Sequence, residues 1–356
     1  MSESTRAGDG APVRHGGSPG RSRGSSRGGD RVMVPEADFT SYYGRPIVKA
    51  APWERDIAYY LFTGGVAAGT SLLAGGADLT DRPGLRRASR IGSLIALLLS
   101  VVALVHDLGK PSRFLNMLRV VKLTSPMSVG TWILSLHAPF AGLASAAELV
   151  GMLPTRWQRG PVRLLLRLGR PAGLVGAVTA PPVAAYTAVL LSDTATPAWH
   201  SAHEDLPFVF CGSAAAASGG WAMATAPVTE AGPARAFAVG GAAVELLMAH
   251  RMESSMGLSA ETLHTGKAGM LMRASKVLTA AGAAGAVLGG RSRLVSVVSG
   301  TALMAGSLCT RLGVYEAGMA SARDPKYTVV PQRERVERGE QVRYRAEPAG
   351  RDVDHT

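Results

Sequence analysis

Cysteine is almost absent from this chain, whose 356 residues include only Cys211 and Cys309. An iron–sulfur cluster typically takes four thiolate ligands, so we do not expect this chain to hold one by itself. No C-x-x-C pair occurs, which excludes the common cysteine-based zinc sites. Histidine is also scarce, and His106, His137 and His250 do not form the matched axial pairs that a b-type haem needs. The sequence therefore predicts no metal, haem or iron–sulfur cluster in this chain.

Charged residues are also few: they make up 18 % of the chain, against about 25 % in typical soluble proteins. The net charge is nevertheless +12. The basic residues lie mostly in the tails and in short segments between apolar runs, where anionic lipid headgroups explain them more simply than a nucleic acid does. Residues 1–30 are rich in Gly, Ser and Arg and contain no apolar signal-peptide core, so we expect disorder there and no secretory signal.

Long apolar runs are what the sequence has in abundance, and several continue for about 20 residues without a charged side chain. A helix of about that length spans the hydrocarbon core of a bilayer, and lipid requires every backbone amide to be bonded internally. The runs predict eight transmembrane helices, at residues 57–77, 91–108, 128–150, 171–192, 206–229, 236–251, 271–290 and 294–310.

The predicted fold class is therefore an all-α, multi-pass membrane protein with eight transmembrane helices. The expected division is a disordered basic tail (1–50), a first bundle (51–192), a second bundle (193–313) and a polar C-terminal tail (314–356). Eight spans place both termini on one side of the bilayer, here called the tail side. The segment 78–90 is expected to be a loop, and a short interfacial helix is expected within 110–126.

Ionisable and aromatic side chains gather near the tail side of the predicted helices, where each is a candidate for function because burying it in lipid is costly. Asp56 and Tyr59 open the first helix, His106 and Asp107 end the second, and Tyr186 lies late in the fourth. Several readings stay open. Tyr59 is either an interfacial aromatic or a ligand contact, and Trp199 fits an interfacial belt as well as a binding role. Glu245 is either paired with Arg251 or a proton relay.

A quinone would suit this set of side chains. Its two carbonyl oxygens need hydrogen-bond donors that also exchange protons, such as His, Tyr and Asp, beside an apolar slot for the tail. Two other classes fit an eight-helix chain: a secondary transporter or ion channel, and an inert structural membrane anchor. A transporter often shows an internal repeat, and none is evident between residues 57–192 and 206–313.

Three groups of short motifs give a more specific indication. The first is the string His106-Asp107-Leu108-Gly109-Lys110-Pro111, followed by Arg113-Phe114 and by residues 124–128. The second is Tyr186-Thr187 with residues 190–192 and 197–199, and the third is Ala317-Gly318, Ser321-Ala322 and Asp324-Pro325. In this order the chain, over about residues 42–330, resembles the membrane subunits of the NrfD/polysulfide reductase family.

The resemblance implies an eight-helix subunit of the plasma membrane, built as two four-helix bundles and without haem or metal. Such a subunit anchors a four-cluster-type iron–sulfur subunit and a molybdopterin catalytic subunit. It further implies electron exchange between the iron–sulfur partner and menaquinone or ubiquinone, as in formate dehydrogenases and polysulfide or nitrite reductases. The family's quinone-contacting Tyr falls on Tyr186, and its Asn and His on the first helix fall on Asp56 and Tyr59, which differ in type.

The resulting hypothesis assigns three roles on the tail side. Asp56, Tyr59 and Tyr186 bind the quinone, and His106, Asp107 and Glu245 transfer protons. The iron–sulfur partner docks over residues 110–126 and 193–205, where the candidate contacts are Lys110, Arg113, Ser125, Trp199 and His200.

Overall fold

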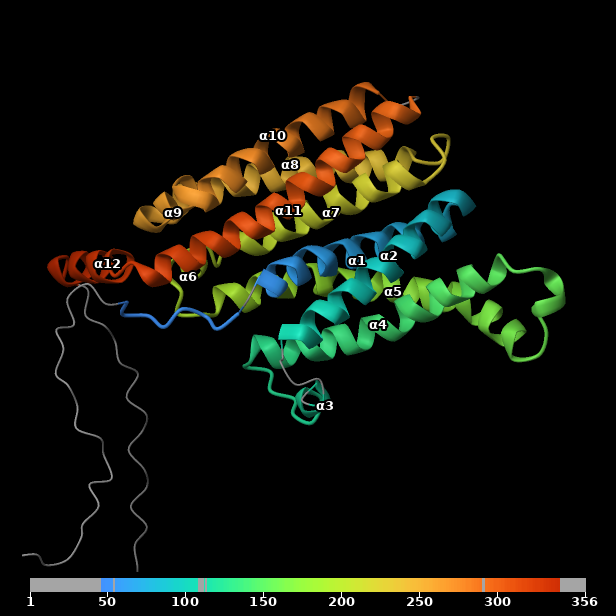
Figure 1. Cartoon of the computed structure of the whole chain (residues 1–356), viewed down its shortest axis with the longest axis horizontal. Coiled ribbons are helices and arrows are strands. Elements are labelled where there is room, and N and C mark those ends of the chain that lie inside the picture. Colours follow the sequence, from blue (N-terminus) through green and yellow to red (C-terminus); the bar gives the residue numbers. More distant parts are fainter. Residues whose placement is uncertain (1–45, 54, 108–111, 113, 290–291, 340–356) are drawn as a thin grey trace, which may run out of the picture. The chain divides into compact units, whose positions relative to one another are not determined.

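The computed structural model describes residues 46–53, 55–107, 112, 114–289 and 292–339, and all regular secondary structure in these residues is helical (Figure 1). Eight of the described helices have 20 or more residues: α1 (Arg55–Leu79), α2 (Pro83–Asp107), α4 (Pro126–Gly151), α5 (Pro161–Ser192), α7 (Leu206–Thr225), α8 (Gly232–Ser255), α10 (Gly266–Leu288) and α11 (Arg293–Arg323). The short elements are α3 (Phe114–Met117), η2 (Thr155–Trp157), α6 (Pro197–Ser201), η3 (Gly257–Ala260), α9 (Glu261–His264) and α12 (Lys326–Glu337).

Seven of the long helices in the described residues are long and apolar enough to cross a membrane, and α8 is not among them. The chain is therefore a multi-pass membrane protein. The α8 helix carries Glu245, Arg251 and Glu253 along its second half. By length and apolarity, seven of the described helices are therefore candidate spans, and the predicted count of eight is not confirmed.

The long helices form two sets of neighbours. In the first helix set, α1, α2, α4 and α5 pack against one another, and in the second helix set, α7, α8, α10 and α11 do the same. The two sets meet where α1 and α5 contact α7. Small residues allow the close approach: a Cβ atom on Gly69 of α1 would lie 2.7 Å from the Ser218 Cβ of α7.

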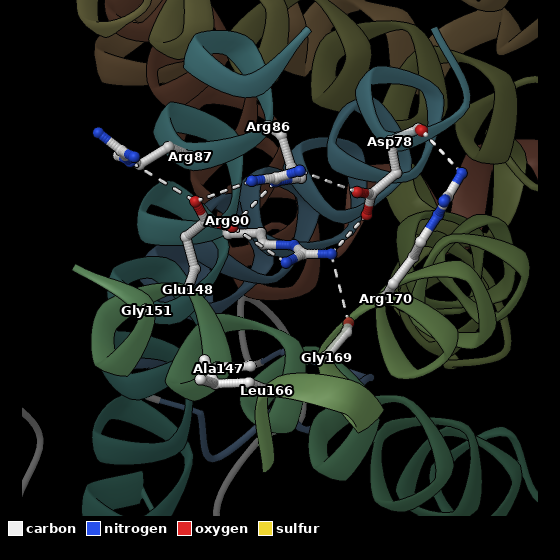
Figure 2. Close-up of a pocket in the computed structure, with 10 residues that line it drawn as sticks. All are labelled: Asp78, Arg86, Arg87, Arg90, Ala147, Glu148, Gly151, Leu166, Gly169 and Arg170. Carbon is white, nitrogen blue, oxygen red and sulfur yellow. Dashed lines mark hydrogen bonds and ion pairs between the residues drawn. The ribbon is translucent and has the colours of Figure 1, made fainter. Parts of the chain in front are cut away.

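The segment 78–90 was expected to be a loop, and this prediction is wrong, because α2 begins at Pro83 and contains Arg86, Arg87 and Arg90. Proline at the first position suits a helix start, since its missing N–H would have no partner there. The arginines can lie on a helix near the membrane surface because Asp78 and Glu148 pair with them (Figure 2).

Other helix ends also differ from the predicted ones. The α5 helix starts ten residues early, at Pro161, again with proline in its first turn. The α11 helix continues to Arg323, so Arg311 lies inside a helix rather than at its end. Beyond Asp324, within the expected polar C-terminal tail, residues Lys326–Glu337 form α12. The predicted interfacial helix reduces to the four residues of α3, and Val121 lies outside it.

Candidate functional site

An apolar crevice opens beside Tyr186 within the first helix set. Its volume is about 150 Å³, and its walls come from all four long helices of the set, together with α3 and the segment before α1. The lining side chains are Trp53, Ile57, Tyr60, Val101, Leu104, Asp107, Met117, Met127, Thr131, Leu134, Ser135, Ala138, Tyr186 and Leu190. A mostly apolar cavity with a few polar groups is typical of a small-molecule site.

Besides the indole N–H of Trp53, five of the lining residues carry groups that can hydrogen-bond to a ligand. Tyr60 and Tyr186 supply phenols, Thr131 and Ser135 supply hydroxyls, and Asp107 supplies a carboxylate. The Tyr186 ring lies directly against Gly130 of α4, where a Cβ atom would come within 2.3 Å of the ring. Glycine at this position therefore makes room for the phenol in the crevice wall.

Asp56 and His106 form a pair that ties the start of α1 to the end of α2. The His106 Nδ1 and Asp56 Oδ2 atoms are 2.6 Å apart, and 75 % of the His106 side chain is exposed. Asp56 also lines an open polar cavity of about 420 Å³ with Arg55, Lys267, Glu316 and Arg323, among other residues. Trp53 lines both this cavity and the crevice, so the apolar crevice adjoins a solvent-accessible, charged surface.

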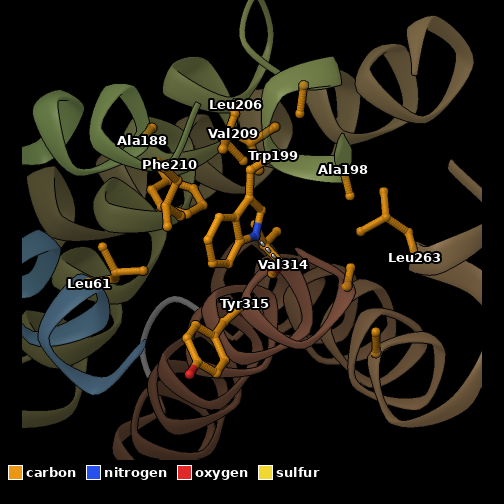
Figure 3. Close-up of a cluster of buried hydrophobic side chains, with 14 of the residues drawn as sticks. Leu61, Ala188, Ala198, Trp199, Leu206, Val209, Phe210, Leu263, Val314 and Tyr315 are labelled. Carbon is orange, nitrogen blue, oxygen red and sulfur yellow. Dashed lines mark hydrogen bonds between the residues drawn. The ribbon is translucent and has the colours of Figure 1, made fainter. Parts of the chain in front are cut away.

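Trp53 is held in place by a buried aromatic cluster (Figure 3). Its ring stacks on Trp199 at 5.7 Å between centroids, and its carbonyl oxygen accepts a 2.5 Å hydrogen bond from the Tyr315 hydroxyl. Trp199 is 1 % exposed, and its Nε1 donates to the Val314 carbonyl oxygen at 2.8 Å. Trp199, which was expected to contact the docked partner, is thus buried in the core beside Trp53, where it supports the crevice wall.

The other residues expected to dock a partner fall in different environments. His200 is exposed, and its Nδ1 atom lies 3.1 Å from the Ser192 carbonyl oxygen. The Ser125 hydroxyl caps α4 by accepting a hydrogen bond from the Ser128 amide. Lys110 and Arg113 lie outside the described residues.

Four of the residues expected at the site do not line the crevice. Asp56, an expected quinone contact, lines the adjoining polar cavity and pairs with His106, and Tyr59 and Glu245 lie apart from the crevice lining. The side chain of Tyr59 is absent from the lining, and 46 % of the residue is exposed. Glu245 lies in the second helix set, is 2 % exposed and accepts a 2.5 Å hydrogen bond from the Thr310 hydroxyl. Arg251 pairs with Asp205 at 3.0 Å rather than with Glu245, so this pairing does not account for the buried carboxylate.

Tyr60 and Ser135 are crevice residues that the sequence reasoning missed. A signal existed for Tyr60, because it follows Ile57 by three residues and precedes Gly64 by four, and such spacing places residues on one helix face. Ser135 gave no comparable signal, since a lone serine in an apolar run is common. Among the described residues, no group of three or more His, Cys, Asp or Glu side chains could hold a metal ion.

Comparison with known families decides what kind of membrane protein this is. The family described as "Polysulphide reductase, NrfD" matches residues 47–231, more than half of the chain. The chain belongs to the NrfD family. Members of this family are membrane subunits that associate with iron–sulfur and molybdopterin oxidoreductase subunits. The match includes the whole crevice, from Trp53 to Leu190. A search of curated proteins finds no match.

Proposed function

We propose that this NrfD-family chain is the quinone-interacting membrane anchor of an oxidoreductase complex. It would pass electrons between an iron–sulfur partner and menaquinone or ubiquinone, in a complex with a molybdopterin catalytic subunit of the formate dehydrogenase or polysulfide or nitrite reductase type. The observation that carries the proposal is the apolar crevice with a phenol, a carboxylate and hydroxyls in its wall. We further propose that the two helix sets are four-helix bundles and that α8 is the eighth span, in the plasma membrane.

The crevice residues fit a quinone headgroup. A quinone carbonyl oxygen accepts hydrogen bonds, and the Tyr186 hydroxyl is a donor in the crevice wall. Reduction to a quinol adds two protons, and a carboxylate and an imidazole can exchange these with water. Asp107 lines the crevice, and the exposed His106 beside Asp56 adjoins the open polar cavity. We therefore assign proton exchange to His106 and Asp107, and we leave Glu245 out because it does not line the crevice.

The partner is proposed to dock on the tail side, over the segment that precedes α4. Val120, Val121 and Leu123 are 61 %, 63 % and 84 % exposed there, although all three are apolar. His200, on the short α6 helix, contributes an exposed polar group at the same side. An exposed apolar patch rimmed by polar residues is typical of a protein contact.

Quinone binding can be measured directly in the chain reconstituted in lipid nanodiscs. Trp53 lines the crevice, so a bound short-chain quinone would quench its fluorescence. We expect Tyr186→Phe to weaken binding by about threefold to tenfold, since a net hydrogen bond contributes about 0.5–1.5 kcal/mol. Tyr59→Phe is the matched control, because it removes a phenol outside the crevice and should leave the affinity unchanged.

Three results would contradict the proposal. Saturable quenching that is equal in the wild type and in a folded Tyr186→Phe variant would remove the phenol from the site. No saturable quenching at all, in a preparation that still binds an iron–sulfur partner, would make the chain an inert anchor. Substrate flux across sealed vesicles without quinone binding would instead favour a transporter.

A further inference from the structure

A second cavity, of about 250 Å³, lies at the end of the first helix set opposite the crevice (Figure 2). Its charged lining comes from four helices: Asp78 of α1, Arg86, Arg87 and Arg90 of α2, Glu148 of α4 and Arg170 of α5. Asp78 is the penultimate residue of α1, and Glu148 lies three residues before the end of α4. At a rise of about 1.5 Å per residue, both carboxylates lie within one helical turn of the helix ends.

The cations in this cavity outnumber the anions, with four guanidinium groups and two carboxylates. Both carboxylates are already shared: Glu148 contacts Arg86, Arg87 and Arg90 at 3.0–3.5 Å, and Asp78 contacts Arg86 and Arg90. Among the described residues, Arg170 hydrogen-bonds to the backbone carbonyl oxygen of Asp78, at 3.3 Å, and forms no ion pair. The lining therefore has a formal charge of +2, which is unfavourable beside a hydrocarbon phase unless an anion compensates it.

Two of the arginines lie near solvent. The Arg87 side chain is 52 % exposed and, within the described part of the chain, pairs through its Nε atom alone, and the Arg86 side chain is 31 % exposed. Arg90 is 7 % exposed and fixed by both carboxylates, yet its Nε atom has no hydrogen-bond partner among the described residues. Guanidinium groups bind phosphate through paired N–H donors, so the rim of the cavity is suited to an oxyanion with several acceptor oxygens.

The surroundings distinguish a lipid from a small soluble anion. Ala147 and Leu166 form an apolar part of the cavity wall. Leu164 and Leu168, on the same helix as Leu166, are 59 % and 42 % exposed, as side chains that face lipid are. A ligand with a phosphate head and acyl chains would meet both surfaces, since basic pockets between transmembrane helices bind anionic headgroups.

We propose that this cavity binds the phosphate of an anionic phospholipid between α1, α2, α4 and α5. Arg87 and Arg170 contact the phosphate oxygens from the rim, and Arg86 contributes from the side. Arg90 stays paired with Asp78 and Glu148 and supplies positive charge from below. The acyl chains leave along Leu166 and Leu168 towards the bilayer. This site is independent of quinone chemistry, so its test does not rest on the function proposed above.

The experiment measures thermal unfolding of the full chain, delipidated in a neutral detergent, during titration with phosphatidylglycerol, phosphatidylcholine or inorganic phosphate. Phosphatidylglycerol should raise the Tm saturably, and phosphatidylcholine should not. The double variant Arg87→Gln/Arg170→Gln should raise the half-saturating concentration of phosphatidylglycerol by roughly tenfold or more, because each arginine near a membrane surface contributes to binding of anionic lipid. Arg159→Gln/Arg163→Gln is the matched control, since both residues are exposed and outside the cavity.

Each other outcome has a defined meaning. Equal effects of phosphatidylglycerol and phosphatidylcholine, or equal titrations of the double variant and the wild type, would overturn the proposal. A Tm increase with inorganic phosphate that phosphatidylglycerol does not exceed would overturn the lipid as the ligand and leave a phosphate site. Where the double variant fails to fold, Arg170→Gln alone serves, because Arg170 hydrogen-bonds to a backbone carbonyl and, within the described residues, forms no ion pair; it should weaken the lipid effect about threefold.

Discussion

The two ends of the first helix set show how one group of helices builds two chemically different cavities. On the tail side, the crevice is lined mainly by apolar side chains, and each polar group belongs to a different turn of a helix. At the opposite end, five of the six charged side chains form ion pairs with one another, and the apolar wall is small. The same four helices pack together to form both cavities. The kind of ligand that each cavity suits depends instead on a few side chains near the helix ends.

The largest expected difference between the two ends is in stability. Arg90→Met would leave Asp78 and Glu148 buried with less compensating charge, and removing one partner of a buried ion pair costs about 3–5 kcal/mol. Tyr186→Phe at the other end should change stability by less than about 0.5 kcal/mol. Thermal unfolding in detergent measures both. Arg159→Met controls for loss of charge at an exposed position. Equal changes in stability for the Arg90 and Tyr186 substitutions would contradict the predicted difference between the two ends of the helix set.

The second prediction concerns packing at the crevice. Gly130→Ala places a Cβ atom within 2.3 Å of the Tyr186 ring, and overpacking of this kind costs about 1–3 kcal/mol. It should also displace the phenol and weaken quinone quenching. Gly142→Ala is the control on the same helix, because no heavy atom lies within 4 Å of the added Cβ. If both substitutions destabilise the protein equally, the cause is the helix backbone and not the contact with Tyr186.

The sequence predicted the long helices and the family, because uninterrupted apolar runs have few alternatives in lipid and the motifs are local. It failed at the helix ends where arginines occur. Arg86 and Arg90 were assigned to a loop because their ion-pair partners, Asp78 and Glu148, lie on other helices. A sequence alone does not show which residues of different helices form ion pairs. Tyr186 was placed beside an apolar crevice as expected. Tyr59 was predicted as the site residue, whereas Tyr60 lines the crevice. Which of these two adjacent tyrosines faces inward depends on how α1 is rotated about its axis, and the sequence does not give that rotation.

A third prediction tests whether the aromatic cluster supports the crevice from outside. Trp199→Phe removes the 2.8 Å hydrogen bond to the Val314 carbonyl oxygen and part of the stacking surface for Trp53. We expect a loss of about 1–2 kcal/mol of stability and a shift in Trp53 emission. Trp132→Phe is the control, since that side chain is 40 % exposed. An unchanged quinone affinity in a folded Trp199→Phe variant would show that the aromatic cluster does not support the crevice.

The smallest expected effect on stability is at Ser135. A substitution there tests whether a residue of the crevice wall can affect quinone binding without affecting the stability of the fold. Ser135 is half-buried in the crevice wall, and Ser135→Ala removes one hydroxyl from it without adding volume. Stability should change by less than about 0.5 kcal/mol. The quinone dissociation constant should nevertheless rise about threefold, because one net hydrogen bond contributes on the order of 1 kcal/mol. Ser128→Ala, at the start of the same helix and outside the crevice lining, should leave it unchanged. If Ser135→Ala leaves the dissociation constant unchanged while Tyr186→Phe raises it, the headgroup lies towards α5 rather than α4.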